Sequence, residues 1–387
     1  NINLFEPIGQ FGSRLNGGKD AAQPRYIHTK LSEITKKIFN PQDTPLLNNR
    51  DDDGIKVEPY WYVPIIPMIL VNGCSGIGTG WSTSIPCYNP IDIIKCINNI
   101  LDDNEDLNKP LIPWYRGFRG SINKISLKSY ESKGLYHFES DDKLIITELP
   151  IGVWTDKYKE HLESLTYDSK ADKKKQDKQV IRYYTSQCTD SKVHFEIYFM
   201  KEMGIEFKYD TKRLEKIFKL SSSVTTTNMV LHDDTGNMKK MESVEEILKY
   251  FIDVRIDYYE KRKDYQLGEL EKEINVLKVK IRFIMDFIED RLIINNKKKV
   301  EIIEQLEKME YPKKDDEYDY LLRMPIYNLT KEKIDEFNEL HNNKQSQFDT
   351  LTVQTPKQIW KHDLKELHEY LKKQKYDSSI IKIKKNK

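Results

Sequence analysis

The sequence predicts a multidomain α+β chain, in which a mixed region of helices and strands is followed by long helices. Short alternating runs typical of strands lie between residues 118 and 199. Apolar residues at helical spacing precede these runs, in residues 27–39 and 90–112. From Val244 onward, apolar residues alternate at spacings of four and three, which is the heptad pattern of long amphipathic helices.

Length and charge limit the number of domains and the kind of binding surface. At 387 residues, and with roughly one domain per 150 residues, the chain has room for two or three domains. The charged fraction of 32% is close to the hydrophobic fraction of 38%, which favours elongated helical parts with much solvated surface. The net charge is +1, so any DNA site has to be a local basic patch.

Cysteine use and apolar runs indicate a reduced, intracellular protein with no membrane span. The cysteines are Cys74, Cys87, Cys96 and Cys188. None belongs to a C-x-x-C pair or has a histidine at metal-ligand spacing, so we interpret them as free thiols. The longest apolar run, residues 63–71, is short and contains two prolines. Because the chain begins with Asn1, we expect it to be a piece of a longer polypeptide.

The predicted elements follow in chain order. A helix over residues 27–39 ends at Asn40-Pro41. Residues 63–72 are expected to form a buried extended segment that leads into a loop rich in glycine at residues 73–81. A helix follows at 90–112, then strands at 118–125, 135–138, 143–147 and 193–199, a helix at 155–165, and a charged loop at 170–178.

Two heptad segments near the end of the chain predict a coiled coil. The first contains Leu270, Ile274, Leu277, Ile281, Ile284 and Ile288, and the second contains Trp360, Leu364, Leu367 and Leu371. The second segment has a helix start at Thr355-Pro356. Because a long connector separates them, we interpret the two segments as the outgoing and returning arms of one antiparallel coiled coil.

The chemistry of the chain is expected in residues 10–27, Gln-Phe-Gly-Ser-Arg-Leu-Asn-Gly-Gly-Lys-Asp-Ala-Ala-Gln-Pro-Arg-Tyr-Ile. The segment combines three glycines, which allow close approach of the backbone, with the cations Arg14, Lys19 and Arg25, which suit a phosphodiester. Tyr26 follows directly and is a candidate nucleophile, although from the residues alone a packing role is favoured, as for most tyrosines. The glycine spacing does not make a P-loop, so nucleotide binding is disfavoured.

Two apolar residues have notable surroundings in the sequence. Ile77 lies between glycines in residues 73–81; a β-branched side chain on a glycine-rich tip can act as a wedge between base pairs, but from the residues alone a place in the core is favoured. Trp154 follows Leu149-Pro150 directly before a predicted helix, where a tryptophan can be a core anchor.

These segments, in order, resemble motifs of the eukaryotic-type DNA topoisomerase II family (type IIA). Residues 10–27 are similar to that family's active-site stretch, with Asn16 in place of its histidine and Gln23 in place of its serine. Residues 63–82, the Leu-Pro-x-x-x-Trp at 149–154, the Phe-Lys-Leu run at 218–229, residues 318–333 and residues 355–364 are similar to further family motifs.

The resemblance implies a domain organisation and a homodimer. Residues 1–65 would be the end of a winged-helix domain and residues 66–243 a mixed α/β tower domain. Residues 244–387 would be a long antiparallel coiled coil with a small helical dimerisation head, through which two copies pair as an exit gate. The implied partner is double-stranded DNA, and the implied location is the nucleus.

The resemblance also implies roles for single residues. Tyr26 would form a 5′-phosphotyrosyl link, and Arg25 would stabilise the transition state. Ile77 would enter the base stack, Trp154 would lie against DNA, and the cations Arg14 and Lys19 would hold flanking phosphates. Mg²⁺ would be held by an acidic domain before residue 1 and ATP by a further N-terminal domain, so we expect this fragment to dimerise without cleaving DNA.

Two other interpretations stay open at this point. One is a non-enzymatic DNA-binding coiled-coil dimer of the SMC kind, which explains the heptads but not the Arg25-Tyr26 context. The other is a bacterial-type gyrase A-like subunit, which the ending Gly-Thr-Gly-Trp-Ser of the loop that contains Ile77 disfavours.

Overall fold

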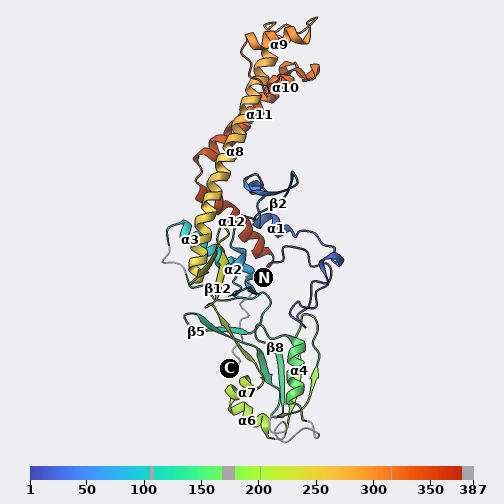
Figure 1. Cartoon of the computed structure of the whole chain (residues 1–387), viewed down its shortest axis with the longest axis vertical. Coiled ribbons are helices and arrows are strands. Elements are labelled where there is room, and N and C mark those ends of the chain that lie inside the picture. Colours follow the sequence, from blue (N-terminus) through green and yellow to red (C-terminus); the bar gives the residue numbers. More distant parts are fainter. Residues whose placement is uncertain (105–108, 168–178, 201, 315, 377–387) are drawn as a thin grey trace. The chain divides into compact units, whose positions relative to one another are not determined.

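The computed structural model describes residues 1–104, 109–167, 179–200, 202–314 and 316–376. Within these residues the fold is mixed α+β, as predicted (Figure 1). The chain forms two compact units: Asn1–Arg255 with Lys361–Lys387, and Ile256–Trp360. The charged loop predicted at residues 170–178 lies outside the described residues.

The first part of the chain contains less helix than the sequence predicts. Its elements are η1 (Pro24–Tyr26), α1 (Glu33–Ile38), η2 (Pro41–Leu46), β1 (Asn49–Asp52) and β2 (Ile55–Pro59). The predicted helix at 27–39 begins only at Glu33, because the residues before it pair with the N-terminal segment. The amide of Glu6 donates to the Lys30 carbonyl at 3.0 Å, and the amide of Ser32 donates to the Leu4 carbonyl at 3.0 Å.

Residues 63–72, which were expected to be extended, end in a helix. Residues 73–81, which were expected to form a loop, belong to a hairpin. Met68–Asn72 form α2, after Pro67 at the N-cap. The strands β3 (Cys74–Gly78) and β4 (Trp81–Ile85) then pair antiparallel, with Ile77 opposite Ser82. Backbone pairing across the glycines therefore makes a two-stranded hairpin where a glycine-rich loop was predicted.

The following helix and strands agree more closely with the sequence patterns. The helix α3 (Pro90–Leu101) has Asn89 as N-cap, whose side chain accepts from the Ile91 amide at 2.9 Å. A three-stranded antiparallel sheet has the order β11-β6-β5, made of Ser221–Thr225, Ser129–Lys133 and Ser121–Ser126. The strand β12 (Met229–His232) pairs with β13 (Met238–Met241).

A four-stranded antiparallel sheet forms the centre of the largest core. Its order is β7-β8-β10-β9, made of Leu135–Phe138, Lys143–Glu148, Phe195–Phe199 and Ile181–Ser186. The helices α4 (Thr155–Leu165), α6 (Met203–Tyr209) and α7 (Thr211–Ile217) contribute to the same core. Alternate residues of β10 (Phe195, Ile197 and Phe199) are buried, which is the period-two pattern that predicted this strand.

The second unit is helical. It takes most of α8 (Val244–Ile288), together with α9 (Lys299–Lys308), α10 (Asp319–Leu322), η4 (Ile326–Asn328), α11 (Lys331–Val353) and the start of α12 (Pro356–Lys373). A small core at the end of α8 includes Phe283, Ile284, Leu306 and Leu321.

The helix α11 returns antiparallel beside α8 (Figure 1). Lys263 on α8 donates to the carbonyl of Thr352 at 2.9 Å, and Glu273 further along α8 pairs with Lys344 at 2.7 Å. The sequence placed the returning arm at residues 360–371, but Leu364 and Leu367 of α12 are buried in the first unit. None of the residues of α11 is buried, so this helix has no strong apolar period that the sequence could show.

A core truncation measures what the four-stranded sheet contributes to stability. We expect Phe195→Ala to lower the free energy of unfolding by about 3–5 kcal/mol, because Phe195 is fully buried and the change leaves a cavity. The control Tyr209→Ala removes an aromatic ring that is 90% exposed, and we expect at most about 0.5 kcal/mol. Urea unfolding followed by far-UV circular dichroism checks both values, and equal losses would contradict the assigned core.

Candidate functional site

Residues 10–22 form a closed loop, which we call the glycine loop. The amide of Ala22 donates to the Gln10 carbonyl at 2.9 Å, which joins its two ends. Within it, the amide of Ser13 donates to one oxygen of Asp20 at 2.9 Å and the Ser13 hydroxyl donates to the other at 2.5 Å. These two bonds hold the pKa of Asp20 below its usual range, and the bond from the hydroxyl has the larger effect.

The glycine loop is docked against the start of α4. The carbonyl of Leu15 accepts from the Asp156 amide at 3.1 Å, and the side-chain amide of Asn16 donates to the Asp156 carboxylate at 3.0 Å. Gly17 has φ +63°, and a Cβ at this position would lie 2.2 Å from Cε2 of Trp154. Glycine is therefore required here by both the backbone and the tryptophan ring.

Trp154 thus serves the docking of the glycine loop, which is neither of the two roles weighed from the sequence. Its ring lies against Gly17, and 36% of the residue is exposed, so it is not a buried core anchor. Asn16, which departs from the resembled family, has a hydrogen-bond partner in Asp156 on α4.

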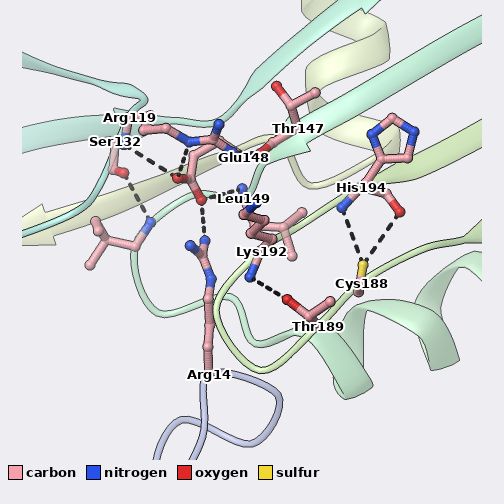
Figure 2. Close-up of polar contacts among 11 residues, drawn as sticks. Arg14, Arg119, Ser132, Thr147, Glu148, Leu149, Cys188, Thr189, Lys192 and His194 are labelled. Atoms are coloured by element: carbon pink, nitrogen blue, oxygen red, sulfur yellow. Dashed lines mark hydrogen bonds and ion pairs between the residues drawn. The ribbon is translucent and has the colours of Figure 1, made fainter. Parts of the chain in front are cut away.

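Arg14 extends from the glycine loop to a buried carboxylate on the four-stranded sheet (Figure 2). Its guanidinium donates to Glu148, whose side chain is fully buried at the end of β8, while Arg14 itself is 24% exposed. The backbone amide of Arg14 also donates to the Asp190 carbonyl at 3.2 Å. The sequence predicted Arg14 as a ligand of phosphate, and the structure gives it a carboxylate partner.

Tyr26 and Arg25 stand together on the surface just after the glycine loop. Tyr26 is the last residue of η1, a single turn set up by Pro24, and is 71% exposed. The Arg25 guanidinium lies 5.6 Å from the centre of its ring. An exposed phenol beside a cation can approach an anionic ligand from solvent, and a packing role for Tyr26 does not fit this exposure.

Ile77 and Lys19 are also at the surface. Ile77 is 93% exposed near the tip of the β3–β4 hairpin, so it does not belong to the core. A hydrogen bond to a residue outside the hairpin also holds its second strand: the amide of Ser84 on β4 donates to the carbonyl of Asn228 at 2.7 Å. Lys19 is exposed on the glycine loop.

Two carboxylates of the site, Glu148 and Asp156, were missed by the sequence reasoning. Asp156 lies in the first turn of α4, where acidic residues are common, so its sequence position carries no special signal. Glu148 carried a weak signal: it occupies a core-facing position of a buried strand, two residues after Ile146, and buried carboxylates need partners.

Within the described ranges, no group of three or more His, Cys, Asp and Glu side chains is arranged to hold a metal ion. The residues described here therefore do not fit a Mg²⁺ site, and no chemical step is assigned to a metal. None of the described helices combines the length and the apolar character that crossing a bilayer requires.

Comparison with known proteins identifies the class. The family model for the A subunit of DNA gyrase/topoisomerase IV matches residues 1–365, so the chain belongs to this family. It is 39% identical to DNA topoisomerase 2 of Penicillium chrysogenum over 95% of this chain and 24% of the relative. It is 38% identical to DNA topoisomerase 2 of Plasmodium falciparum over 97% of this chain and 28% of the relative.

A solved structure agrees with these relatives. The crystal structure of the Plasmodium falciparum topoisomerase II DNA-binding, cleavage and re-ligation domain is similar with a TM-score of 0.85 and 38% identity, covering 97% of this chain and 53% of that one. The resemblance to eukaryotic-type topoisomerase II is thereby confirmed. The chain spans only about a quarter of the length of the two curated relatives.

The docking of the glycine loop can be tested at its tightest contact. We expect Gly17→Ala to displace the loop from Trp154, because the new Cβ clashes with the ring and the backbone has positive φ. Tryptic cleavage after Lys19 should become several-fold faster. Gly18→Ala is the control, since its φ is +82° but nothing lies within 4 Å of the added atom. Equal protection of both variants would contradict the docking.

The hydrogen bonds from Ser13 to Asp20 predict how the stability of the glycine loop depends on pH. A carboxyl whose pKa is lower in the folded protein stabilises the fold above its unfolded pKa of about 3.9, and this contribution disappears as pH falls through the folded pKa. The glycine loop should therefore lose protection from pepsin below about pH 4.

The same prediction has a direct spectroscopic form. We expect Ser13→Ala to move the Asp20 pKa upward toward its usual range, because the hydroxyl is the largest cause of the shift. A carboxyl carbon NMR titration measures the change, with Asp142 as the internal reference, since its pKa is lowered by Ser140 instead. An unchanged Asp20 titration would show that the hydroxyl bond is not formed in solution.

Proposed function

We propose that the chain is part of a type II DNA topoisomerase that cuts both strands of a duplex, lets a second duplex pass, and reseals the break, so that DNA is relaxed and decatenated. The observation that carries this proposal is Tyr26. The residue is exposed, has a guanidinium 5.6 Å from its ring, and follows a docked glycine loop in a chain of this family.

In this proposal the Tyr26 oxygen attacks a backbone phosphorus. The phenolic proton is lost to solvent, the new oxygen–phosphorus bond forms as the bond to the 3′ oxygen breaks, and the 3′ oxygen takes up a proton from solvent and leaves as a hydroxyl. The 5′-phosphotyrosyl diester is similar in energy to the bond it replaces, so resealing needs no external energy. Arg25 would stabilise the extra negative charge that develops on the phosphoryl oxygens.

The surrounding residues would hold and bend the duplex. Ile77 is exposed at a braced hairpin tip, which suits a wedge that unstacks a base step at a cost of about a few kcal/mol. Trp154 would contact DNA with its exposed atoms, and Lys19 would bind a flanking phosphate. Arg14 would reach a phosphate only with the guanidinium nitrogens that Glu148 leaves unused.

Cutting both strands requires two tyrosines and hence two chains. We infer a homodimer that pairs through the helical head of the second unit. Ile326 and Tyr327 in η4 support this inference, since they are apolar and 84% and 78% exposed. The three-part division at residues 1–65, 66–243 and 244–387 is retained as part of the proposal, and so is the antiparallel coiled coil.

Cofactors and location follow from the relatives and are also proposals. From the similarity to longer DNA topoisomerase 2 relatives, we infer that Mg²⁺ and ATP are bound by other parts of the complete protein. The chain on its own is therefore expected not to form a covalent DNA adduct. A nuclear location is inferred from the similarity to eukaryotic DNA topoisomerase 2.

The nucleophile can be tested with a closely matched control. In the complete protein, we expect Tyr26→Phe to abolish the covalent DNA adduct while leaving DNA affinity and dimerisation unchanged, since only the attacking oxygen is removed. The control is Tyr60→Phe. Tyr60 is 64% exposed and has the Arg50 guanidinium 5.3 Å from its ring, but lies outside the glycine loop region.

Adducts are trapped by denaturing the protein on end-labelled DNA with Mg²⁺ present. Loss of the adduct in Tyr60→Phe together with its retention in Tyr26→Phe would reassign the nucleophile. DNA binding by the unmodified complete protein with no adduct under any condition would favour the non-enzymatic alternative.

A further inference from the structure

Glu148 is a charged residue in a position that otherwise takes apolar side chains. It shares a face of β8 with Leu144 and Ile146, and all three are fully buried. Moving a carboxylate out of water is costly unless cations and hydrogen-bond donors replace the lost solvent. Its partners therefore indicate what the residue does.

Donors from two parts of the chain converge on this carboxylate (Figure 2). On the sheet side, the amide of Leu149 donates to Oε1 at 3.1 Å, the amide of Arg119 donates to Oε2 at 3.3 Å, and Nε of Arg119 lies 3.5 Å from Oε2. On the other side, Arg14 donates to Oε1 from the glycine loop. Arg119 is 46% exposed and has a second acceptor in the Thr147 carbonyl, so it stays at the sheet without Glu148.

Arg14 is the only one of these donors that the glycine loop supplies among the described residues, so the carboxylate acts across the boundary between loop and sheet. Residue 14 is held at its side chain by Glu148 and at its backbone by the Asp190 carbonyl. The bond between Ala22 and Gln10 closes the glycine loop, and only three residues separate Ala22 from Tyr26. A displacement of Arg14 therefore reaches the tyrosine through a short, proline-restricted connection.

We propose that Glu148 is a positioning residue for the cleavage reaction: it fixes Arg14, and through the glycine loop it fixes the attacking oxygen of Tyr26. The inference rests on the proposed function of Tyr26 as the nucleophile. It predicts a separation between binding and chemistry. Loss of the Glu148 charge slows cleavage, whereas DNA affinity stays the same or rises, because one negative charge near the cation Arg14 has been removed.

The experiment uses the complete protein with Mg²⁺, saturating amounts of a duplex, and single-turnover formation of the Tyr26 adduct. Four variants are compared: Glu148→Gln, Arg14→Gln, the double variant, and the control Glu196→Gln. Glu196 lies on the neighbouring strand β10 and pairs with Lys143 at 3.2 Å, without contact to the glycine loop. DNA affinity is measured on the same proteins as a function of salt, below the unfolding temperature of each variant.

We expect Glu148→Gln to slow adduct formation about ten- to a hundredfold at saturating DNA, without loss of affinity. The double variant should be no slower than the slower single variant, because both changes break the same contact. Glu196→Gln should cleave like the unmodified protein. A purely stabilising role for Glu148 would lower the melting temperature and leave the saturated rate unchanged.

Several results would overturn the proposal. One is a saturated rate in folded Glu148→Gln equal to that of the unmodified protein. Another is a loss confined to DNA affinity. If Glu148→Gln does not fold, the Arg14→Gln variant tests the proposal in its place, because it removes the contact from the glycine loop and leaves Arg119 paired with Glu148. A normal rate of adduct formation in Arg14→Gln then overturns the proposal. If the unmodified protein forms no adduct that depends on Tyr26, the proposed function fails instead.

Discussion

The site depends on the docking of a glycine-rich loop onto the edge of a sheet core. A loop of this composition has high conformational entropy, and ordering each residue costs about 1–2 kcal/mol. The cost is offset by contacts of several kinds at one place. Gly17 lies under the Trp154 ring, Leu15 accepts from the first turn of α4, and Arg14 binds Glu148.

The docking explains why polar and apolar contacts occur together in this site. The Trp154 ring lies against Gly17, and the Arg14–Glu148 ion pair joins the same loop to the end of β8. Tyr26 follows this docked segment and is 71% exposed, as the proposed nucleophile has to be in order to reach a phosphorus atom from solvent.

Ile77 is likewise an exposed side chain on a hydrogen-bonded segment. An apolar side chain that is 93% exposed costs free energy in water, and it is tolerated here on a short paired hairpin whose second strand is hydrogen-bonded to Asn228. Tyr60 and Arg50 show that an exposed tyrosine with a nearby guanidinium occurs elsewhere on this surface. The distance from guanidinium to ring is similar in the two pairs, so it does not distinguish them. What distinguishes Tyr26 is its position just after the docked glycine loop.

The sequence by itself determined the elements whose pattern is local. The strand Leu135–Phe138 and the helix Thr155–Leu165 lie where alternation and helical spacing predicted them, since each pattern records which side of its own element is buried. The order of motifs was likewise sufficient to indicate the family. Tertiary structure decided the partner of Arg14, since Glu148 is 134 positions away. It also decided the shortening of the helix at 27–39 and the return of the chain along α11, whose residues are not buried. These features depend on pairing between distant segments, and no period within one segment records such a pairing.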